Sequence, residues 1–212
     1  MREPKDRTII RTTALLAAAL LTAACKDVDV TDPRVAMAIS EINATFRKGY
    51  QEALVEVGMR HFAIEPAVAT AAMRRTVEQL GMTVLNSEGD YYLHVTALAP
   101  RPLDAKDWLE VRRIDEPSFK DIATRHLGIK GRLAKLEPDG LNVVGVVTLI
   151  PTRDGVDISI TMRTEEIKPQ PPESILPRRE YPPPTAVRIG YEKIWKKFEE
   201  LAVPVSGMAQ RG

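Results

Sequence analysis

The stretch Leu141–Ile150, which reads LNVVGVVTLI, decides the fold of this chain together with Asp154-Gly155 and the segment Val156–Ile167. The first segment carries apolar residues on both faces of a strand, which favours a central position in a sheet. The last segment alternates apolar and polar residues, so one of its faces is expected to contact water. Asp and Gly both accept a positive φ angle, and the pair therefore predicts a hairpin between the two strands. The chain is expected to form around this antiparallel pair.

Four further segments are expected to be strands, because their apolar residues alternate between turn signals. The polar turn Ser87-Glu88-Gly89 separates two of them, and Asp139-Gly140 is a second hairpin signal leading into Leu141. The sheet is therefore expected to be antiparallel, with about five to six strands. The four segments are Met59–Ile64, Met82–Asn86, Asp90–Ala99 and Ile129–Leu136.

Three segments place apolar residues at spacings of three and four, which predicts amphipathic helices. Asp32-Pro33 opens the first helix, with an acidic cap followed by proline at the first helical position. Gly81 ends the second helix as a left-handed cap. Trp195 and Phe198 lie on the apolar stripe of the third helix and are expected in the core. The three helices are expected at Pro33–Glu52, Pro66–Leu80 and from Thr185 to residue 202.

Two proline-containing segments are expected to be connections. Pro100–Pro117 contains three prolines and Trp108, and it precedes a short helix expected at Ser118–Leu127. Lys168–Pro184 is rich in proline and charge, a composition that favours polyproline II and buries little surface. Both segments are candidate contact surfaces, because connections often carry function. For Trp108 the sequence leaves open whether the side chain packs in the core or meets a partner.

These elements predict an α+β fold with two layers. An antiparallel sheet of about five to six strands would pack against two or three amphipathic helices. We expect a single domain over residues 33–203, including the proline-rich segment 168–184, followed by a flexible tail over residues 204–212.

The first 24 residues have the composition of an export signal. A polar, net basic start is followed by the apolar run Thr12–Ala24, which is shorter than the roughly 20 residues that a membrane-spanning helix needs. Small residues then precede Cys25, the only cysteine in the chain. We expect residues 1–24 to be a signal peptide and residues 25–32 to be a short polar tether.

The sequence Leu21-Thr22-Ala23-Ala24-Cys25 resembles the lipobox of bacterial lipoproteins, with Thr22 where that family usually has leucine. The resemblance implies that the Cys25 thiol carries a diacylglycerol, that cleavage precedes Cys25, and that its new amine is acylated. Lys26 follows in place of the aspartate that retains enterobacterial lipoproteins at the inner membrane. The resemblance therefore implies a protein anchored in the outer membrane and facing the periplasm. A non-lipidated signal peptide and an uncleaved anchor are the alternatives.

The order of elements resembles a broad group of small bacterial lipoproteins, among them accessory lipoproteins of outer-membrane assembly with a helix-grip fold. The residues that carry this resemblance are Val77–Val84, Asp154-Gly155 and Tyr191–Leu201. None of them is a catalytic motif, so the resemblance implies a fold and no specific activity.

The sequence offers little catalytic chemistry. Its three histidines, His61, His94 and His126, have no metal-ligand spacing. His61 and His94 fall on expected strands, where with Glu88 or Asp90 they would make a weak metal or acid–base site; otherwise they are solvent-facing sheet residues. Nucleophile elbows and glycine-rich phosphate loops are absent from the sequence. With 30 basic and 29 acidic residues, the chain lacks the basic excess of a nucleic-acid-binding protein. We expect no enzyme activity, no cofactor and no metal.

Two functions of different classes fit the sequence. The first is a structural or protein-interaction role at the periplasmic face of a membrane, with an envelope protein bound through residues 100–117 or 168–184. The second is a small-ligand or lipid-binding module, in which Ala69, Ala71 and Ala72 leave space between helix and sheet. The same alanines would equally allow close packing. A hydrolase with an unrecognised site is a third class, for which the sequence shows no convergent polar groups.

Overall fold

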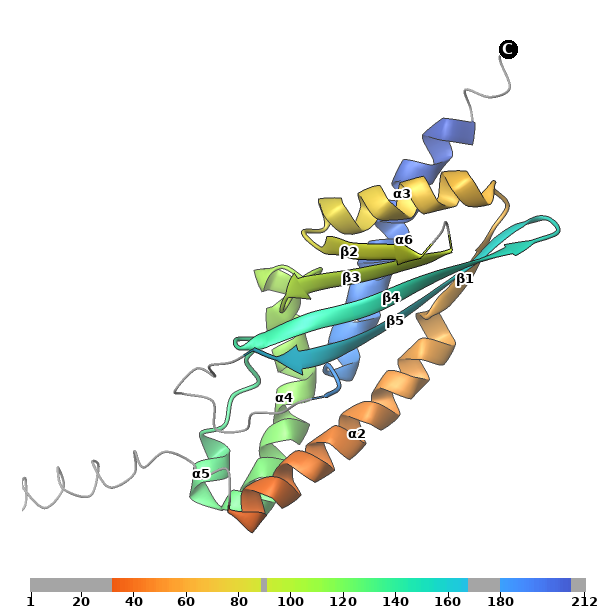
Figure 1. The fold of residues 1–212 in the computed structure, drawn as a ribbon. Helices are drawn as coiled ribbons and strands as arrows, with labels where there is room; N and C mark the ends of the chain where they lie inside the picture. Colours follow the sequence, from red (N-terminus) through yellow and green to blue (C-terminus); the bar gives the residue numbers. More distant parts are fainter. Residues whose placement is uncertain (1–31, 89–90, 168–179, 207–212) are drawn as a thin grey trace, which may run out of the picture.

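The computed structural model describes residues 32–88, 91–167 and 180–206, and Figure 1 shows the arrangement of their elements. The fold is α+β, as the sequence predicts. In chain order the elements are α2 (Pro33–Val57), β1 (Met59–Phe62), α3 (Pro66–Gln79), β2 (Thr83–Glu88), β3 (Tyr92–Leu98), α4 (Ala105–Leu127), α5 (Ile129–Arg132), β4 (Leu141–Thr152), β5 (Gly155–Glu166) and α6 (Pro184–Ser206).

The five strands form one antiparallel sheet in the order β1-β5-β4-β3-β2. β4 is the middle strand, which confirms the prediction from its apolar residues on both faces. Across the sheet, Val147 of β4 lies between Leu93 of β3 and Ile160 of β5. Gly155, with a φ of 155°, follows Asp154 in the tight β4–β5 turn, as expected.

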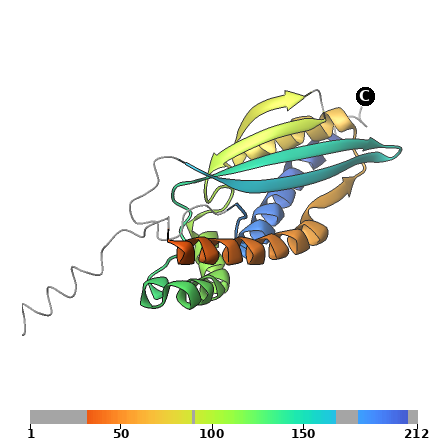
Figure 2. The same ribbon diagram turned by 60° about the horizontal axis from the view of Figure 1, so that its bottom comes forward.

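Helices cover one face of the sheet, and Figure 2 shows the other face without a helix over it. The covered face contributes Leu93, Val95, Val147 and Ile160, which are at most 1% exposed, to the first core cluster. α3 and α6 pack against these side chains, with Trp195 and Phe198 fully buried as predicted. On the open face Thr161 and Arg163 of β5 are exposed, which confirms the wet face expected for this strand.

The outer edge of β5 is only partly covered by β1, whose pairing reaches from Val156 to Ser159, opposite Met59. Beyond that point the Ile160 N–H donates to the carbonyl of Gly58 at 2.9 Å. The Tyr191 hydroxyl then donates to the Ile160 carbonyl at 3.1 Å, and the Met162 N–H donates to the Tyr50 hydroxyl at 3.1 Å. Two tyrosines from α6 and α2 thus replace a neighbouring strand along this edge.

A second core cluster lies among the helices α2, α4 and the first turn of α6. It contains Ile42 and Phe46 of α2 together with Phe119 and Ile122 of α4, all at most 3% exposed. The α2–α6 approach is close at Gly49, where a Cβ atom would lie 2.4 Å from the Pro184 Cγ. Glycine in the middle of α2 therefore has a packing reason that offsets its low helix propensity.

The segment 100–117 was predicted as a connection, and this is wrong over most of its length. α4 begins at Ala105 and runs through Pro117 to Leu127, so the helix expected at 118–127 is only its second half. The Asp104 carboxylate accepts from the backbone of Lys106 and Asp107, and the Asp107 side chain accepts from the Asp104 N–H, which completes a capping box. This cap and the buried stripe outweigh the backbone bond that Pro117 removes.

The strand predicted at 129–136 is also wrong. Residues Ile129–Arg132 form the short helix α5, and a Cβ on Gly131 would lie 2.3 Å from the backbone carbonyl of Ala123. The glycine lets α5 lie directly on α4. At this position the segment is not beside an edge of the sheet, so a strand would have no neighbour to pair with. Asp139-Gly140 therefore makes a turn into β4, with Gly140 at a φ of 77°, but closes no hairpin.

Helix ends differ from the predictions in two further places. α2 continues past Glu52 to Val57, because Ala53 is fully buried and Gly58 N–H bonds to the Leu54 carbonyl. α6 continues to Ser206, so residues 204–206, predicted as part of a flexible tail, are helical. The expectations for residues 1–31, 89–90, 168–179 and 207–212 lie outside the described residues.

Replacing Tyr191 by Phe tests the cover of the β5 edge. The variant leaves the buried Ile160 carbonyl without its hydroxyl donor, and we expect the free energy of unfolding to fall by about 1–3 kcal/mol. Urea denaturation followed by circular dichroism measures this change. Tyr92→Phe on the open face, where the side chain is 43% exposed, is the control and should stay within about 0.5 kcal/mol. An equal loss in both variants would contradict the role of the hydroxyl group.

Candidate functional site

An apolar pocket of about 50 Å³ lies where the ends of β3 and β5 meet the first turns of α4 and α6. We call it the proline-lined pocket. Its side chains are almost all aliphatic, aromatic or proline. The residues that line it are Ala99, Pro100, Arg101, Pro102, Leu103, Trp108, Pro138, Leu141, Val143, Met162, Thr164, Tyr181, Pro182, Pro183, Ala186, Val187, Gly190 and Tyr191.

The first wall of the pocket is the connection between β3 and α4. The Arg101 N–H donates to the Leu98 carbonyl at 3.1 Å, and the Leu103 N–H donates to the Pro100 carbonyl at 2.9 Å. The peptide bonds before Pro100 and Pro102 are cis. These turns keep the chain compact between the strand and the helix, so that both prolines face the pocket.

The second wall is the short stretch before α6. The Thr164 N–H of β5 donates to the Glu180 carbonyl at 3.2 Å, and the Glu180 N–H donates to the Asn43 side chain of α2 at 3.1 Å. The Tyr181 ring lies against the Tyr50 ring, with centroids 5.7 Å apart. Residues 181–183 are therefore held between α2 and the end of the sheet, in a fixed position beside the first wall.

The third wall comes from α6 at Gly190. A Cβ atom there would lie 3.3 Å from the Leu103 Cδ1 and 3.6 Å from the Pro102 Cγ. Because glycine has no side chain, this part of the pocket stays open. A larger residue at 190 would extend into it.

The sequence left open whether Trp108 packs in the core or meets a partner, and in the structure it lies at the boundary between the core and the pocket. It lies on α4 half-buried against the second core cluster, and it also lines the pocket. Its Nε1 atom is buried and has no hydrogen-bond partner among the described residues. The side chain is part of the packing, and its position gives the pocket an aromatic boundary.

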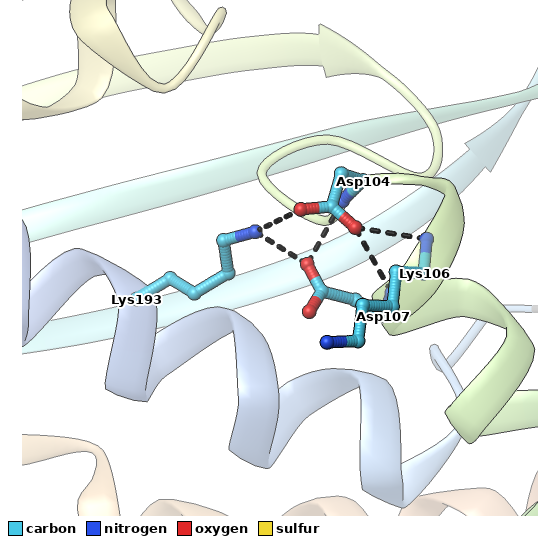
Figure 3. Close-up of polar contacts among 4 residues, drawn as sticks. All are labelled: Asp104, Lys106, Asp107 and Lys193. Carbon is cyan, nitrogen blue, oxygen red and sulfur yellow. Dashed lines mark hydrogen bonds and ion pairs between the residues drawn. The ribbon is translucent and has the colours of Figure 1, made fainter.

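An ion-pair cluster fixes α4 to α6 next to the pocket (Figure 3). The Lys193 ammonium donates to the Asp104 carboxylate at 3.0 Å and also to Asp107. The Asp107 backbone N–H, followed by the Lys193 side chain, lowers the pKa of Asp104 to about 2. Burial opposes the charge on Lys193, but the two carboxylates raise the pKa of its ammonium overall. Asp104 and Lys193 therefore both remain charged at neutral pH.

A second contact between α4 and α6 is a helix cap supplied from outside the helix. The Asp115 carboxylate accepts from the Thr185 N–H at 3.0 Å and from the Thr185 hydroxyl at 2.9 Å. Burial raises the pKa of Asp115, although both donors favour its charged form. The two contacts together set the angle between the helices that form the pocket.

The histidines do not form a common site. His61 lies on β1 and His94 on β3, with β5 and β4 between them, so they are not cross-strand neighbours. His61 Nδ1 lies 2.8 Å from Asp157 Oδ1, and His126 Nε2 lies 2.7 Å from Glu41 Oε2. Within residues 32–88, 91–167 and 180–206, no group of three or more acidic, histidine or cysteine side chains is placed to hold a metal ion.

Of the other residues predicted to have a role, the structure describes the three alanines of α3. Cys25 lies outside the described residues. Ala69 and Ala72 are fully buried and packed in the first core cluster, whereas Ala71 is exposed. No helix in the described part of the chain is both long enough and apolar enough to cross a bilayer.

Comparison with known proteins identified no related protein. The chain matches no protein-family model, and it has no significant match among curated proteins or solved structures.

Replacing Lys193 by Met tests the ion-pair cluster through its pH dependence. The lowered pKa of Asp104 means that its carboxylate stabilises the folded state above about pH 3.8, and that this stabilisation is lost as the pH falls through about 2. We expect the variant to unfold roughly 1–3 °C lower than the native chain at pH 7. This difference should narrow between about pH 4 and pH 2 in calorimetric scans.

The matched control is Lys196→Met, on the exposed side of the same helix. It should change the unfolding temperature little at any pH. If the unfolding temperature of Lys193→Met stays equally far below that of the native chain down to pH 2, lost packing explains the difference, and the charge on Asp104 does not.

Proposed function

We propose that this protein is a bacterial envelope lipoprotein, anchored at Cys25 in the outer membrane and facing the periplasm, which holds a protein partner in the proline-lined pocket. The resemblance of Leu21–Cys25 to a lipobox supports the anchor. Two acyl chains or more on one residue would make the attachment effectively permanent, since one chain alone binds marginally. The proposed role is structural or interactive and involves no catalysis, cofactor or nucleic acid.

The pocket is the single observation that carries the binding role. The two segments expected from the sequence as contact surfaces, around residues 100–117 and 168–184, both contribute to it through Pro100, Trp108 and Tyr181. Grooves lined by aromatic residues recognise extended, often proline-containing peptides, because such segments lose little entropy on binding. A cavity of about 50 Å³ has room for part of one apolar side chain of a partner.

The alternative, a small-ligand or lipid-binding module, has less support from the geometry. Pockets for small ligands typically enclose about 300–1,000 Å³. The space between α3 and the sheet is filled, with Ala69 and Ala72 at 0% exposure. The alanines thus accompany close packing, and the proline-lined pocket is too small to enclose an acyl chain. A protein partner that covers the pocket from outside fits this geometry better.

The anchor predicts the chemistry of the mature N-terminus. Protein purified from native membranes should begin at Cys25 and carry added acyl chains, which intact-mass and fragment mass spectrometry detect. Cys25→Ser should release the protein into the soluble periplasmic fraction. A chain that begins elsewhere, or one without added hydrocarbon on Cys25, would refute the proposed attachment.

The partner-binding role predicts a crosslink that depends on the pocket. A photoreactive phenylalanine analogue at Tyr181 should capture one recurrent envelope protein in intact cells, while the same analogue at Tyr92 on the open sheet face should not. Gly190→Leu places a side chain in the pocket and should reduce the yield about tenfold, as expected for a loss of about 1.4 kcal/mol of binding free energy.

Gly190→Ala is the matched control, because its Cβ requires only a small shift of the Leu103 side chain, 3.3 Å away, and makes an ordinary contact with Pro102 at 3.6 Å. This variant should retain most of the crosslink. If no protein recurs at position 181, or if the leucine and alanine variants behave alike, the pocket is not the partner site.

A further inference from the structure

The corner formed by residues 128–136, which we call the α5 corner, exposes two bulky apolar side chains. Ile129 is 80% exposed and Leu133 is 61% exposed. The residues that face inward are Gly131, Ala134, which is 1% exposed, and Leu136 at the end of the corner, which is 0% exposed. Leu136 and Ala134 thus join the second core cluster, whereas Ile129 and Leu133 stay exposed at the surface.

The contact with α4 fixes the outward position of Ile129 and Leu133. Because a Cβ at residue 131 would lie 2.3 Å from the Ala123 backbone, α5 cannot rotate to bring a larger side chain inward. The Gly131 N–H also bonds to the Gly128 carbonyl at 3.0 Å, and the Ala134 N–H bonds to the Gly131 carbonyl at 3.2 Å. Ile129 and Leu133 are therefore held outward on a packed element.

The charge of the corner has one sign. Lys130, Arg132 and Lys135 are exposed, and the sequence from Gly128 to Leu136 contains no acidic residue. Within the described residues, no ion pair involves any of these three side chains. Apolar side chains bordered by exposed lysine and arginine match the interface of an anionic bilayer, where apolar groups enter the acyl boundary and cations meet phosphate.

The position of the corner in the fold points to the same surface. Figures 1 and 2 both show α5 beside the beginning of α2. The Arg34 side chain, followed by the charge on Lys130 among weaker contributions, lowers the pKa of Asp32, which places Lys130 near the first described residue. Between Cys25 and Pro33 there are eight Cα–Cα steps, which span at most about 29 Å even when fully extended.

The other end of α2 is much farther from the attachment. Val55, which is 89% exposed, lies 22 residues after Pro33 on the same helix, or about 33 Å along its axis. Among the exposed apolar side chains, Ile129 and Leu133 thus lie at the end of the domain that the tether holds nearest to the membrane.

We propose that the α5 corner is a membrane-contact surface, with Ile129 and Leu133 inserted at the headgroup–acyl boundary of an anionic bilayer and Lys130, Arg132 and Lys135 on lipid phosphates. This inference rests on the proposed lipid anchor at Cys25. The contact would orient the domain on the bilayer and leave the tether little freedom.

The test uses the full lipidated chain, reconstituted into vesicles that contain phosphatidylglycerol and a nitroxide-labelled lipid. A cysteine introduced at residue 129 is the only free thiol when the Cys25 thiol carries its diacylglycerol, and it carries an environment-sensitive fluorophore. We expect nitroxide quenching at least about threefold greater for the label in Ile129→Cys than for the label in Val55→Cys. Leu133→Cys provides a second position in case the label at 129 disturbs the corner.

A second comparison tests the attraction between the basic side chains and the anionic lipid. Replacing phosphatidylglycerol by a zwitterionic lipid, or combining Lys130→Glu with Arg132→Glu, should reduce the quenching at residue 129 toward that at residue 55. Equal quenching at the two positions, in protein that floats with the vesicles, overturns the membrane contact and leaves the anchor standing. Protein that does not float overturns both.

A protein occupant would give a different pattern. The label at residue 129 would then be shielded in native membranes and remain unquenched in vesicles of lipid alone. That result would also overturn the membrane contact.

Discussion

The hydroxyl groups of Tyr50 and Tyr191 at the edge of β5 are the constraint on which the rest of the structure depends. β1 covers only the first part of this edge, and the peptide groups of Ile160 and Met162 beyond it are buried. Buried peptide groups require partners, and here the partners come from two different helices. α2 and α6 must therefore cross the sheet at this point, and their mutual packing at Gly49 follows from that requirement.

The same edge continues into the proline-lined pocket. Beyond Met162, the Thr164 N–H is taken by the carbonyl of Glu180, which places residues 181–183 on one side of the pocket. α4 closes the other side, because Lys193 and Asp115 tie it to α6 at two points. The pocket is thus a consequence of how the sheet edge, the 180–183 stretch and two helices are joined.

The proline-lined pocket and the α5 corner have different chemistry. The pocket is small, apolar and almost free of charge, and it lies between elements that are fixed by buried hydrogen bonds. The α5 corner is exposed and basic, with the side chains of Ile129 and Leu133 directed outward. A protein side chain suits the first and a lipid surface suits the second. The two proposals are therefore compatible within one protein.

The amino-acid sequence by itself determined the regular elements whose pattern is local: the β4–β5 hairpin, the central place of β4, and the buried stripes of α2, α3 and α6. Such patterns arise from the period of the side chains along the chain, so they need no distant partner. The full length of α4 was hidden because Pro117 suggested a break, while the capping pair Asp104 and Asp107 that begins the helix was a signal present in the sequence. Tertiary structure alone decided that residues 129–132 form a helix, that His61 and His94 lie apart, and that Pro100, Trp108 and Tyr181 meet in one pocket. These outcomes depend on contacts between residues far apart in the chain, such as Tyr50 with Met162 at a separation of 112 residues, which no local period encodes.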